Sequence, residues 1–329
     1  MLIGKPPEIP SSAITSKEKY LNRRRFLGGA LSSAVVAGVS ATAIERAAEV
    51  FSPRTSIHAD TGTKLDTIKS PLSTTGEQLT SLEDITHYNN FYEFGVDKGD
   101  PARNASALPT RPWSVKVDGL VKQPKVFDIE ALLKLHPLEE RVYRHRCVEA
   151  WSMVIPWVGY SLSEFIKACD PLSKAKYVQF LSYYNHKVEK WASESTIYWP
   201  YSEGLRMDEA MNPLALLTVG LYGEVLPNQD GAPIRIVLPW KYGFKSAKSI
   251  VEVRFLDKQP PTTWNDMAAN EYGFYSNVNP SVDHPRWSQK TERRIGLPFY
   301  AQRRQTLMFN GYGEQVASLY NGMDLKKNY

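Results

Sequence analysis

Hydrophobic and polar positions alternate along this chain with short periods, and the period changes often. Alternation with a period of two is typical of half-buried strands, whereas a period near 3.6 indicates helices. Strands are predicted at residues 113–117, 141–147, 176–184, 214–222, 233–239 and 249–256. Short helices are predicted at residues 128–133, 161–169 and 205–211. These elements alternate too irregularly for a doubly wound sheet, and no repeat period appears, so we predict an α+β fold with a mixed sheet.

The first 43 residues have a different pattern. Arg23, Arg24 and Arg25 precede an uncharged run of mostly small residues that is too weakly apolar for a membrane span of about 20 residues. Ala41-Thr42-Ala43 has the small residues of a cleavage site, so residues 1–43 are predicted to be an export signal. The segment NRRRFL resembles a twin-arginine signal, which implies the twin-arginine translocase as a partner and export in the folded state. The alternative is an uncleaved amphipathic anchor.

Residues 44–86 are rich in serine, threonine and charged residues, and we expect them to form an extended arm or linker. Residues 87–329 would then form the main folded domain. The formal charge of +5 does not change this picture, because residues 1–43 hold six basic and two acidic residues and so carry +4 of it. No basic helix with interleaved aromatic residues follows, so nucleic-acid binding is not expected.

One of only two cysteines lies in the stretch RVYRHRCVEAWS at residues 141–152. Strand alternation should direct Tyr143, His145 and Cys147 to one face. Because three arginines precede Cys147 within six residues, its thiol is expected to be largely thiolate, and hence a nucleophile or a metal ligand. The alternative is a small buried hydrophobic residue. Cys169 ends a predicted helix and is expected to serve in packing.

Two further stretches carry candidate chemistry. HYNNFYEFG at residues 87–95 combines amides with aromatic rings, so it is either a buried turn or a contact to a heterocycle. Arg235, Lys241, Lys245 and Lys248 flank glycine and small residues, so they form either an anion site or a solvated basic loop. The six histidines lack metal-ligand spacing, and no P-loop, nicotinamide or hydrolase motif is present.

Four long motifs occur in order along the chain, namely YNNFYEFG, RCVEAWS, GAPIR and PWKYGFKSAKSI. Together they resemble the molybdopterin-binding core of the sulfite oxidase superfamily. Within it, they are most similar to the catalytic subunits of the bacterial periplasmic protein-methionine-sulfoxide reductases. The resemblance runs from about Tyr88 to the C-terminus and includes PPTTWN, EYGFYSNVNP and DHPRWSQ.

The resemblance implies roles for twelve residues. Cys147 corresponds to the thiolate ligand of molybdenum, and Asn90 and Glu149 correspond to positions near the open face of the metal. The residues implied to bind the pterin and its phosphate are Asn89, Tyr92, Glu93, Ser182, Asp230, Arg235, Ser246, Ala247 and Lys248. Asp230 stands where close relatives carry asparagine and Ser182 where they carry threonine. Ser246-Ala247 replaces Gly-Ile, which suits a loop that binds through its backbone.

The implied activity is oxygen-atom transfer from methionine sulfoxide in periplasmic proteins to a molybdenum-molybdopterin cofactor, which repairs oxidised proteins. Glu149 is expected to relay a proton or to position water. The resemblance further implies a haem-containing membrane subunit as the electron donor. The catalytic subunit is expected to be a monomer, because no dimerisation domain is predicted. Two alternatives stay open, a sulfite-oxidising molybdoenzyme and a non-enzymatic exported scaffold. The first is disfavoured because only about 70 residues follow Phe255, too few for an immunoglobulin-like dimerisation domain of roughly 100 residues.

Overall fold

The computed structural model describes residues 62–74 and 76–329, which all belong to one compact unit. The predicted export signal at residues 1–43 and the first part of the predicted arm, residues 44–61, lie outside the described residues. Within them, no helix is long and apolar enough to cross a membrane.

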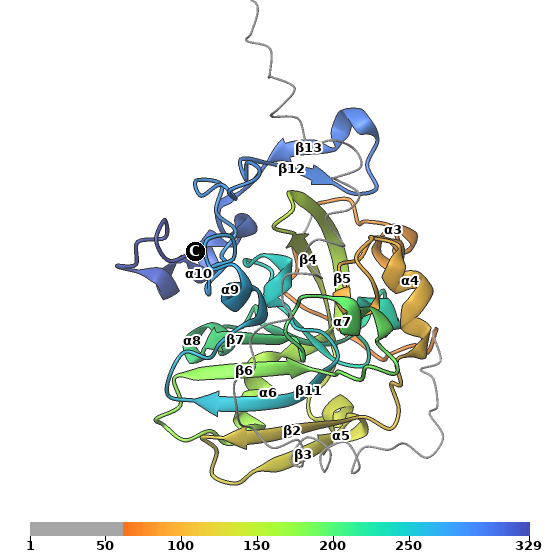
Figure 1. The fold of residues 1–329 in the computed structure, drawn as a ribbon, viewed down its shortest axis with the longest axis vertical. Helices are drawn as coiled ribbons and strands as arrows, with labels where there is room; N and C mark the ends of the chain where they lie inside the picture. Colours follow the sequence, from red (N-terminus) through yellow and green to blue (C-terminus); the bar gives the residue numbers. More distant parts are fainter. Residues whose placement is uncertain (1–61, 75) are drawn as a thin grey trace, which may run out of the picture. The chain divides into compact units, whose positions relative to one another are not determined.

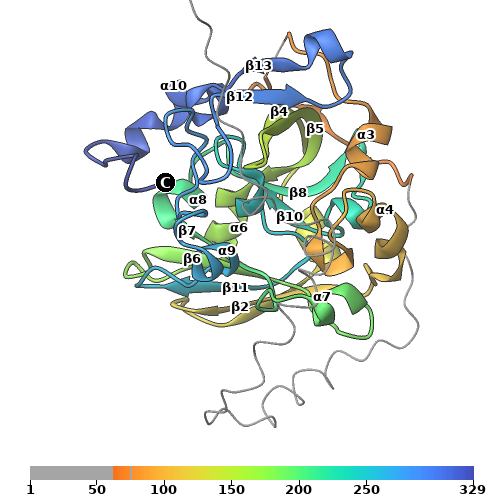
Figure 2. The ribbon, with the colours of Figure 1, turned by 45° about the horizontal axis from the view of Figure 1, so that its top comes forward.

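Two mixed β-sheets lie in separate layers (Figures 1 and 2). The strands of the larger sheet are β1 (Ile68–Lys69), β4 (Glu139–Arg146), β5 (Trp151–Ser161), β8 (Leu216–Leu221), β9 (Glu224–Val225), β10 (Arg235–Val237), β12 (Thr291–Arg294) and β13 (Arg303–Gln305). Those of the smaller sheet, in the order β3-β2-β11-β6-β7, are β2 (Ser114–Gly119), β3 (Lys125–Asp128), β6 (Tyr177–Ser182), β7 (Ser202–Arg206) and β11 (Ile250–Leu256). Each sheet contains parallel and antiparallel pairs, which confirms the predicted α+β class.

Strand β5 organises the larger sheet, and alternation did not predict it. It pairs with β4 and β8 antiparallel and with β12 parallel. All its residues except Ser161 are buried, so its sequence is almost continuously apolar. A strand buried on both faces has no polar alternation to mark it. Strands β4 and β5 are joined by the turn Cys147–Ala150, closed by a 3.1 Å hydrogen bond from Ala150 N to Cys147 O.

The helices are short and lie around the sheets. The α-helices are α3 (Leu82–His87), α4 (Asp100–Asn104), α5 (Ile129–Lys134), α6 (Leu162–Cys169), α7 (Lys190–Glu194), α8 (Met207–Ala210), α9 (Thr263–Met267) and α10 (Gly313–Val316). The 3-10 helices are η2 (Tyr92–Phe94), η3 (Ala105–Ala107), η4 (Asn228–Asp230), η5 (Gly243–Lys245), η6 (Phe299–Ala301), η7 (Met308–Gly311) and η8 (Ala317–Tyr320). The predicted helix at 205–211 is shorter than expected, because residues up to Arg206 belong to β7.

Helix α6 confirms the prediction for residues 161–169. Ser161 is its N-cap residue, but its side chain makes no capping hydrogen bond and instead contacts Arg141 and the carbonyl of Pro213. Cys169 is fully buried and unpaired, as expected for a packing residue.

The described part of the predicted arm packs on the larger sheet. Strand β1 pairs with β4, and Thr80 N donates to Val154 O at 2.9 Å. The predicted boundary at residue 86 falls inside α3, whose Ile85 is buried. This packing brings the segment after α3 against the turn that carries Cys147.

Candidate active site

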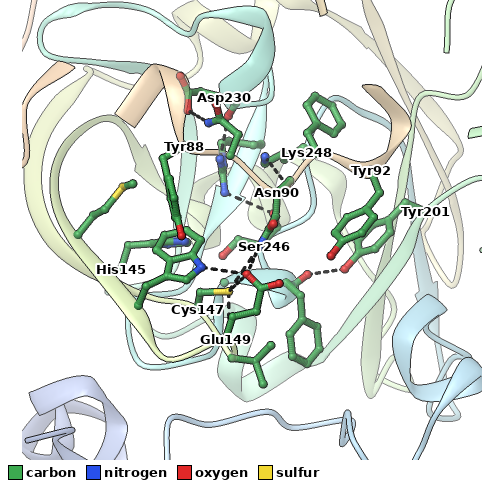
Figure 3. A pocket seen from close by; sticks show the side chains of 18 of the residues that line it. Tyr88, Asn90, Tyr92, His145, Cys147, Glu149, Tyr201, Asp230, Ser246 and Lys248 are labelled. Carbon is green, nitrogen blue, oxygen red and sulfur yellow. Dashed lines mark hydrogen bonds between the residues drawn. The ribbon is translucent and has the colours of Figure 1, made fainter. Parts of the chain in front are cut away.

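A cavity of about 120 Å³ opens beside the turn between β4 and β5. Figure 3 shows Cys147 and Glu149 at one end, Asp230 and Lys248 at the other, and Asn90 between them. The cavity is lined by segments far apart in the sequence, namely residues 85–93, the end of β4, η4 and the loop after η5. It therefore brings together the three stretches that the sequence singled out, which lie within residues 87–95, 141–152 and 235–248.

Ten of the twelve residues implied by the resemblance line this cavity. They are Cys147, Glu149, Asn90, Asn89, Tyr92, Glu93, Asp230, Arg235, Ser246 and Lys248. Ser182 and Ala247 are buried nearby but do not contribute to the wall. The loop at Ser246 already uses part of its backbone, because Ser246 N donates to Gly243 O and Ile236 N donates to Ala247 O.

The sulfur of Cys147 lies in a polar cluster. Asn90 Nδ2 donates to Cys147 Sγ at 3.4 Å and to Glu149 Oε2 at 3.2 Å. Lys98 Nζ donates to the same Glu149 oxygen at 2.5 Å and also to Asn90 Oδ1. Trp151 Nε1 adds a third donor to Glu149 Oε2 at 3.0 Å. Burial raises the pKa of Glu149, but these donors, Lys98 first, bring it below its ordinary value, so the group is a carboxylate.

The expectation that the neighbouring arginines make Cys147 a thiolate is wrong. Burial, followed by the charge of Glu149, raises the pKa of Cys147 to about 12. Arg144 pairs with Glu77 and Arg146 with Glu292, while Arg141 pairs with Glu139. Each guanidinium is therefore committed to a carboxylate away from the sulfur. A thiolate at this position requires a bound cation such as a metal ion.

Two cations occupy the opposite end of the cavity. Arg235 and Lys248 lie on the cavity wall, and Arg235 is 3% exposed. Arg235 NH1 donates to Asp230 O at 2.8 Å, and Lys248 Nζ donates to Asn90 O at 2.9 Å. Among the described residues, neither cation has a carboxylate within ion-pair distance. Burial lowers the pKa of Lys248 to about 7 and that of Arg235 to about 10.

The other lysines of the predicted basic cluster have different partners. Lys241 donates to Glu209 and Lys245 to Glu203, each at 2.6 Å and fully buried. These two ion pairs stabilise the packing around α8 and β7, and neither lysine lines the cavity. The predicted anion site is therefore narrowed to Arg235 and Lys248.

Several buried polar atoms near the cations have no hydrogen-bond partner. They are Asn89 Oδ1, Asp230 Oδ2 and Ser182 Oγ. Asn89 Nδ2 donates to Asp230 Oδ1 at 2.8 Å, and burial raises the pKa of Asp230 to about 6. Burial likewise raises the pKa of Glu93, on η2, to about 7. Since buried polar groups are normally satisfied, this end of the cavity is built for a polar ligand.

These features fit molybdopterin. Its anionic phosphate would compensate Arg235 and Lys248, and the donor groups of the pterin would satisfy the unpartnered acceptors of Asn89 and Asp230. The thiol of Cys147 supplies the soft ligand that molybdenum accepts. In the part of the chain that the structure describes, no group of three or more histidine, cysteine, aspartate or glutamate side chains could hold a metal ion by itself.

Aromatic residues that were assigned no role from the sequence complete the wall. They are Tyr88, Trp151, Trp157, Tyr201, Phe244, Trp264 and Tyr272.

His145 also lines the cavity, and burial together with Arg235 lowers its pKa to about 3, so its imidazole is neutral. Gly243 is required beside it, because a Cβ at that position would lie 2.7 Å from the His145 ring. No sequence pattern indicates a role for Lys98, because that role depends on its contact with Glu149.

The fold and the site together define a molybdopterin-binding oxidoreductase, and residues 103–264 match the family described as "oxidoreductase molybdopterin binding domain". The chain is 59% identical over 323 residues to the "protein-methionine-sulfoxide reductase catalytic subunit MsrP" of Burkholderia mallei, covering 98% of this chain and 96% of that protein. It is 56% identical over 326 residues to the protein of the same name from Ralstonia nicotianae, covering 97% and 96%. The chain therefore belongs to the family of protein-methionine-sulfoxide reductase catalytic subunits.

Among solved structures, the sulfane dehydrogenase SoxCD from Paracoccus pantotrophus matches with a TM-score of 0.41 and 18% sequence identity. That match covers 69% of this chain and 57% of the SoxCD chain.

Proposed function

We propose that this protein reduces methionine sulfoxide residues in proteins with a molybdenum-molybdopterin cofactor held in the cavity beside Cys147. The observation that carries the proposal is the placement of one buried cysteine and two cations, the buried Arg235 and the partly buried Lys248, at opposite ends of one cavity. The metal of this cofactor needs a thiolate ligand, and its anionic phosphate needs cationic side chains. The family membership of the chain supplies the substrate.

The cofactor, when bound, supplies two-electron oxygen-atom transfer chemistry. The protein holds it through Cys147 at the metal and through Arg235 and Lys248 at the phosphate. Asn89, Tyr92, Glu93 and Asp230 are proposed to contact the pterin, supported by their positions on the cavity wall. For Ser182, Ser246 and Ala247, binding of the pterin or its phosphate stays a prediction that rests on the resemblance.

Asn90, Lys98 and Glu149 surround the sulfur and are proposed to handle the oxygen and the protons. Reduction of one sulfoxide consumes two electrons and two protons and releases the oxygen as water. Asn90 Nδ2 and Lys98 Nζ are side-chain donors beside the sulfur, and the Glu149 carboxylate accepts hydrogen bonds from both. This arrangement favours Glu149 as the residue that positions the donors and passes protons to them.

The aromatic wall suits a methionine side chain. Tyr88 and Trp151 form an edge-to-face pair with ring centroids 5.1 Å apart, and Trp264 and Tyr272 lie 4.9 Å apart. Sulfur atoms pack favourably against aromatic rings. We therefore expect these rings to hold the sulfur and methyl group of the substrate while the sulfoxide oxygen faces Asn90.

The protein is proposed to work in the periplasm after export through the twin-arginine translocase, supported by the sequence of residues 1–43. The relatives are named catalytic subunits, which implies a second subunit. A haem-containing membrane subunit is proposed as this partner, because electrons must be delivered from outside the chain. Oxidised periplasmic proteins are the proposed substrates.

An assay with two substrates tests this function against its alternatives. The purified protein, with reduced viologen as the electron source, should reduce methionine sulfoxide in an oxidised protein. The same preparation, with an artificial electron acceptor, should oxidise sulfite at a far lower rate. Sulfite oxidation without sulfoxide reduction would favour the sulfite-oxidising alternative. Absence of both activities in protein that contains no molybdenum would favour the scaffold.

Glu149→Gln is expected to lower the turnover of methionine sulfoxide by about 10- to 100-fold, the range typical of residues that orient a metal site. The neutral amide cannot hold the ammonium group of Lys98 as a carboxylate does. The measurement is the turnover number across the pH range at constant molybdenum content. Glu139→Gln is the matched control. Like Glu149, Glu139 is a part-buried carboxylate that pairs with a basic side chain, here Arg141, but it lies away from the cavity. Full turnover of Glu149→Gln at every pH would remove the proposed role.

A further inference from the structure

The peptide group between Val148 and Glu149 is hydrogen-bonded at both ends. Its N–H, from Glu149, donates to Cys147 Sγ at 3.4 Å. Its oxygen, from Val148, accepts from Trp287 Nε1 and from Gln289 Nε2, each at 2.8 Å. One peptide plane thus connects two side chains of the segment before β12 to the sulfur atom, although neither side chain lines the cavity.

Both donors are held in fixed orientations. The amide oxygen of Gln289 accepts from Arg146 NH2 at 2.8 Å, and because arginine only donates, the amide nitrogen must face Val148. The indole of Trp287 stacks on His284 with centroids 3.8 Å apart and an interplanar angle of 5°. Arg286 lies over the same indole, 4.8 Å from its centroid. The two donors are therefore a rigid clamp on the Val148 oxygen.

Such a clamp acts on the sulfur in two ways. Two donors on one carbonyl polarise the amide and make its N–H a stronger donor. They also fix the plane of the peptide, so that the N–H stays directed at the sulfur. Hydrogen bonds to a metal-bound thiolate withdraw charge from it, and this is one of the means by which proteins set the reduction potential of a metal.

We infer that Trp287 and Gln289 are positioning residues that act through the Val148–Glu149 peptide to set the reduction potential of the metal bound by Cys147. The inference rests on the proposed function, in which Cys147 holds molybdenum. A weaker N–H···S bond leaves more negative charge on the sulfur, which favours the oxidised metal. Loss of the clamp should therefore move the potential to more negative values.

Trp287→Phe tests the inference, because phenylalanine keeps a ring against His284 and removes only the indole donor. The midpoint potential of the bound molybdenum, measured by a redox titration followed by electron paramagnetic resonance, should become more negative at unchanged molybdenum content. Trp199→Phe is the matched control. Trp199 is also part-buried and donates to a backbone carbonyl, that of Ala192 at 2.8 Å, which does not lead to Cys147. This variant should keep the wild-type potential.

The outcomes separate the inference from the proposed function. A wild-type protein without molybdenum would overturn both. Wild-type protein with molybdenum and an unshifted potential in Trp287→Phe would overturn the inference alone. If Trp287→Phe loses its metal, Gln289→Met takes its place and should show the same negative shift. Loss of metal from both variants would contradict a tuning role and leave the clamp only structural.

Discussion

Replacing Cys147 by serine is expected to abolish methionine sulfoxide reduction in a protein that remains folded. The hydroxyl is a poor ligand for molybdenum, whereas the thiolate is a good one. Replacing a residue that only orients a metal ligand typically lowers metal affinity or activity by about 10- to 100-fold. Loss of the ligand itself should therefore lower the rate by more than about 100-fold. Serine has nearly the same volume as cysteine, so the packing of the turn is preserved. The measurements are the reduction rate and the thermal unfolding temperature of the cofactor-free protein.

Cys169→Ser is the matched control for this prediction. Cys169 is the other buried cysteine, on α6, and it lies outside the cavity. Its replacement should leave the rate per molybdenum unchanged and lower stability by about 1 kcal/mol, since a buried hydroxyl replaces a thiol. A Cys147→Ser protein that reduces sulfoxide at the wild-type rate would refute the assignment of the metal ligand.

Lys248→Met is expected to have opposite effects on stability and on cofactor binding. Methionine fills the space of the lysine stem beside the ring of Phe91, which lies 4.6 Å from the ammonium group. Removing a partly buried cation that has no ion-pair partner should stabilise the cofactor-free protein, because the cost of desolvating its charge is removed. The same change removes a phosphate partner, so retention of the cofactor should fall by more than about 100-fold. Chemical denaturation and the molybdenum content of the purified protein measure the two effects.

Lys245→Met provides a sharp contrast three residues away. Lys245 is buried, whereas Lys248 is only partly buried, and Lys245 pairs with Glu203 at 2.6 Å. Its removal should destabilise the protein by about 3–5 kcal/mol, because the buried carboxylate loses its partner. Equal destabilisation by both variants would contradict the distinction between a structural lysine and a ligand-binding one.

The stability of the cofactor-free protein should also depend on pH through Lys248. Its pKa is lowered to about 7 by burial, whereas an unfolded lysine titrates near 10.5. Between these values the unfolded chain binds more protons than the folded chain, so stability should rise with pH across this window. The rise should be weaker in Lys248→Met. Denaturation midpoints at a series of pH values measure the difference.

Strands with one face buried could be predicted from the sequence. The alternation in β2 places Val115 and Val117 in the core, and β2, β4 and β6 were all predicted within two residues at each end. Strand β5 was not predicted, because ten of its eleven residues are buried and alternation is lost. The short strands β12 and β13 depend on pairing with partners that are distant in the sequence, which local patterns do not indicate.

The candidate site was predictable where its residues lie in one motif and not where distant contacts decide their role. Cys147 and Asn90 stand in motifs that the resemblance covers. The different roles of Lys245 and Lys248 follow from Glu203, which reaches only one of them. The same limit explains the wrong expectation for the Cys147 thiol, since the partners of its neighbouring arginines, Glu77 and Glu292, lie far away in the sequence.

Elemental analysis of the protein purified from its native compartment tests the central claim most directly. A cavity that joins a single metal-binding sulfur to a phosphate site predicts one molybdenum atom per chain. Protein that is folded and carries no molybdenum, or that keeps a stoichiometric amount after Cys147 is replaced by serine, would contradict it.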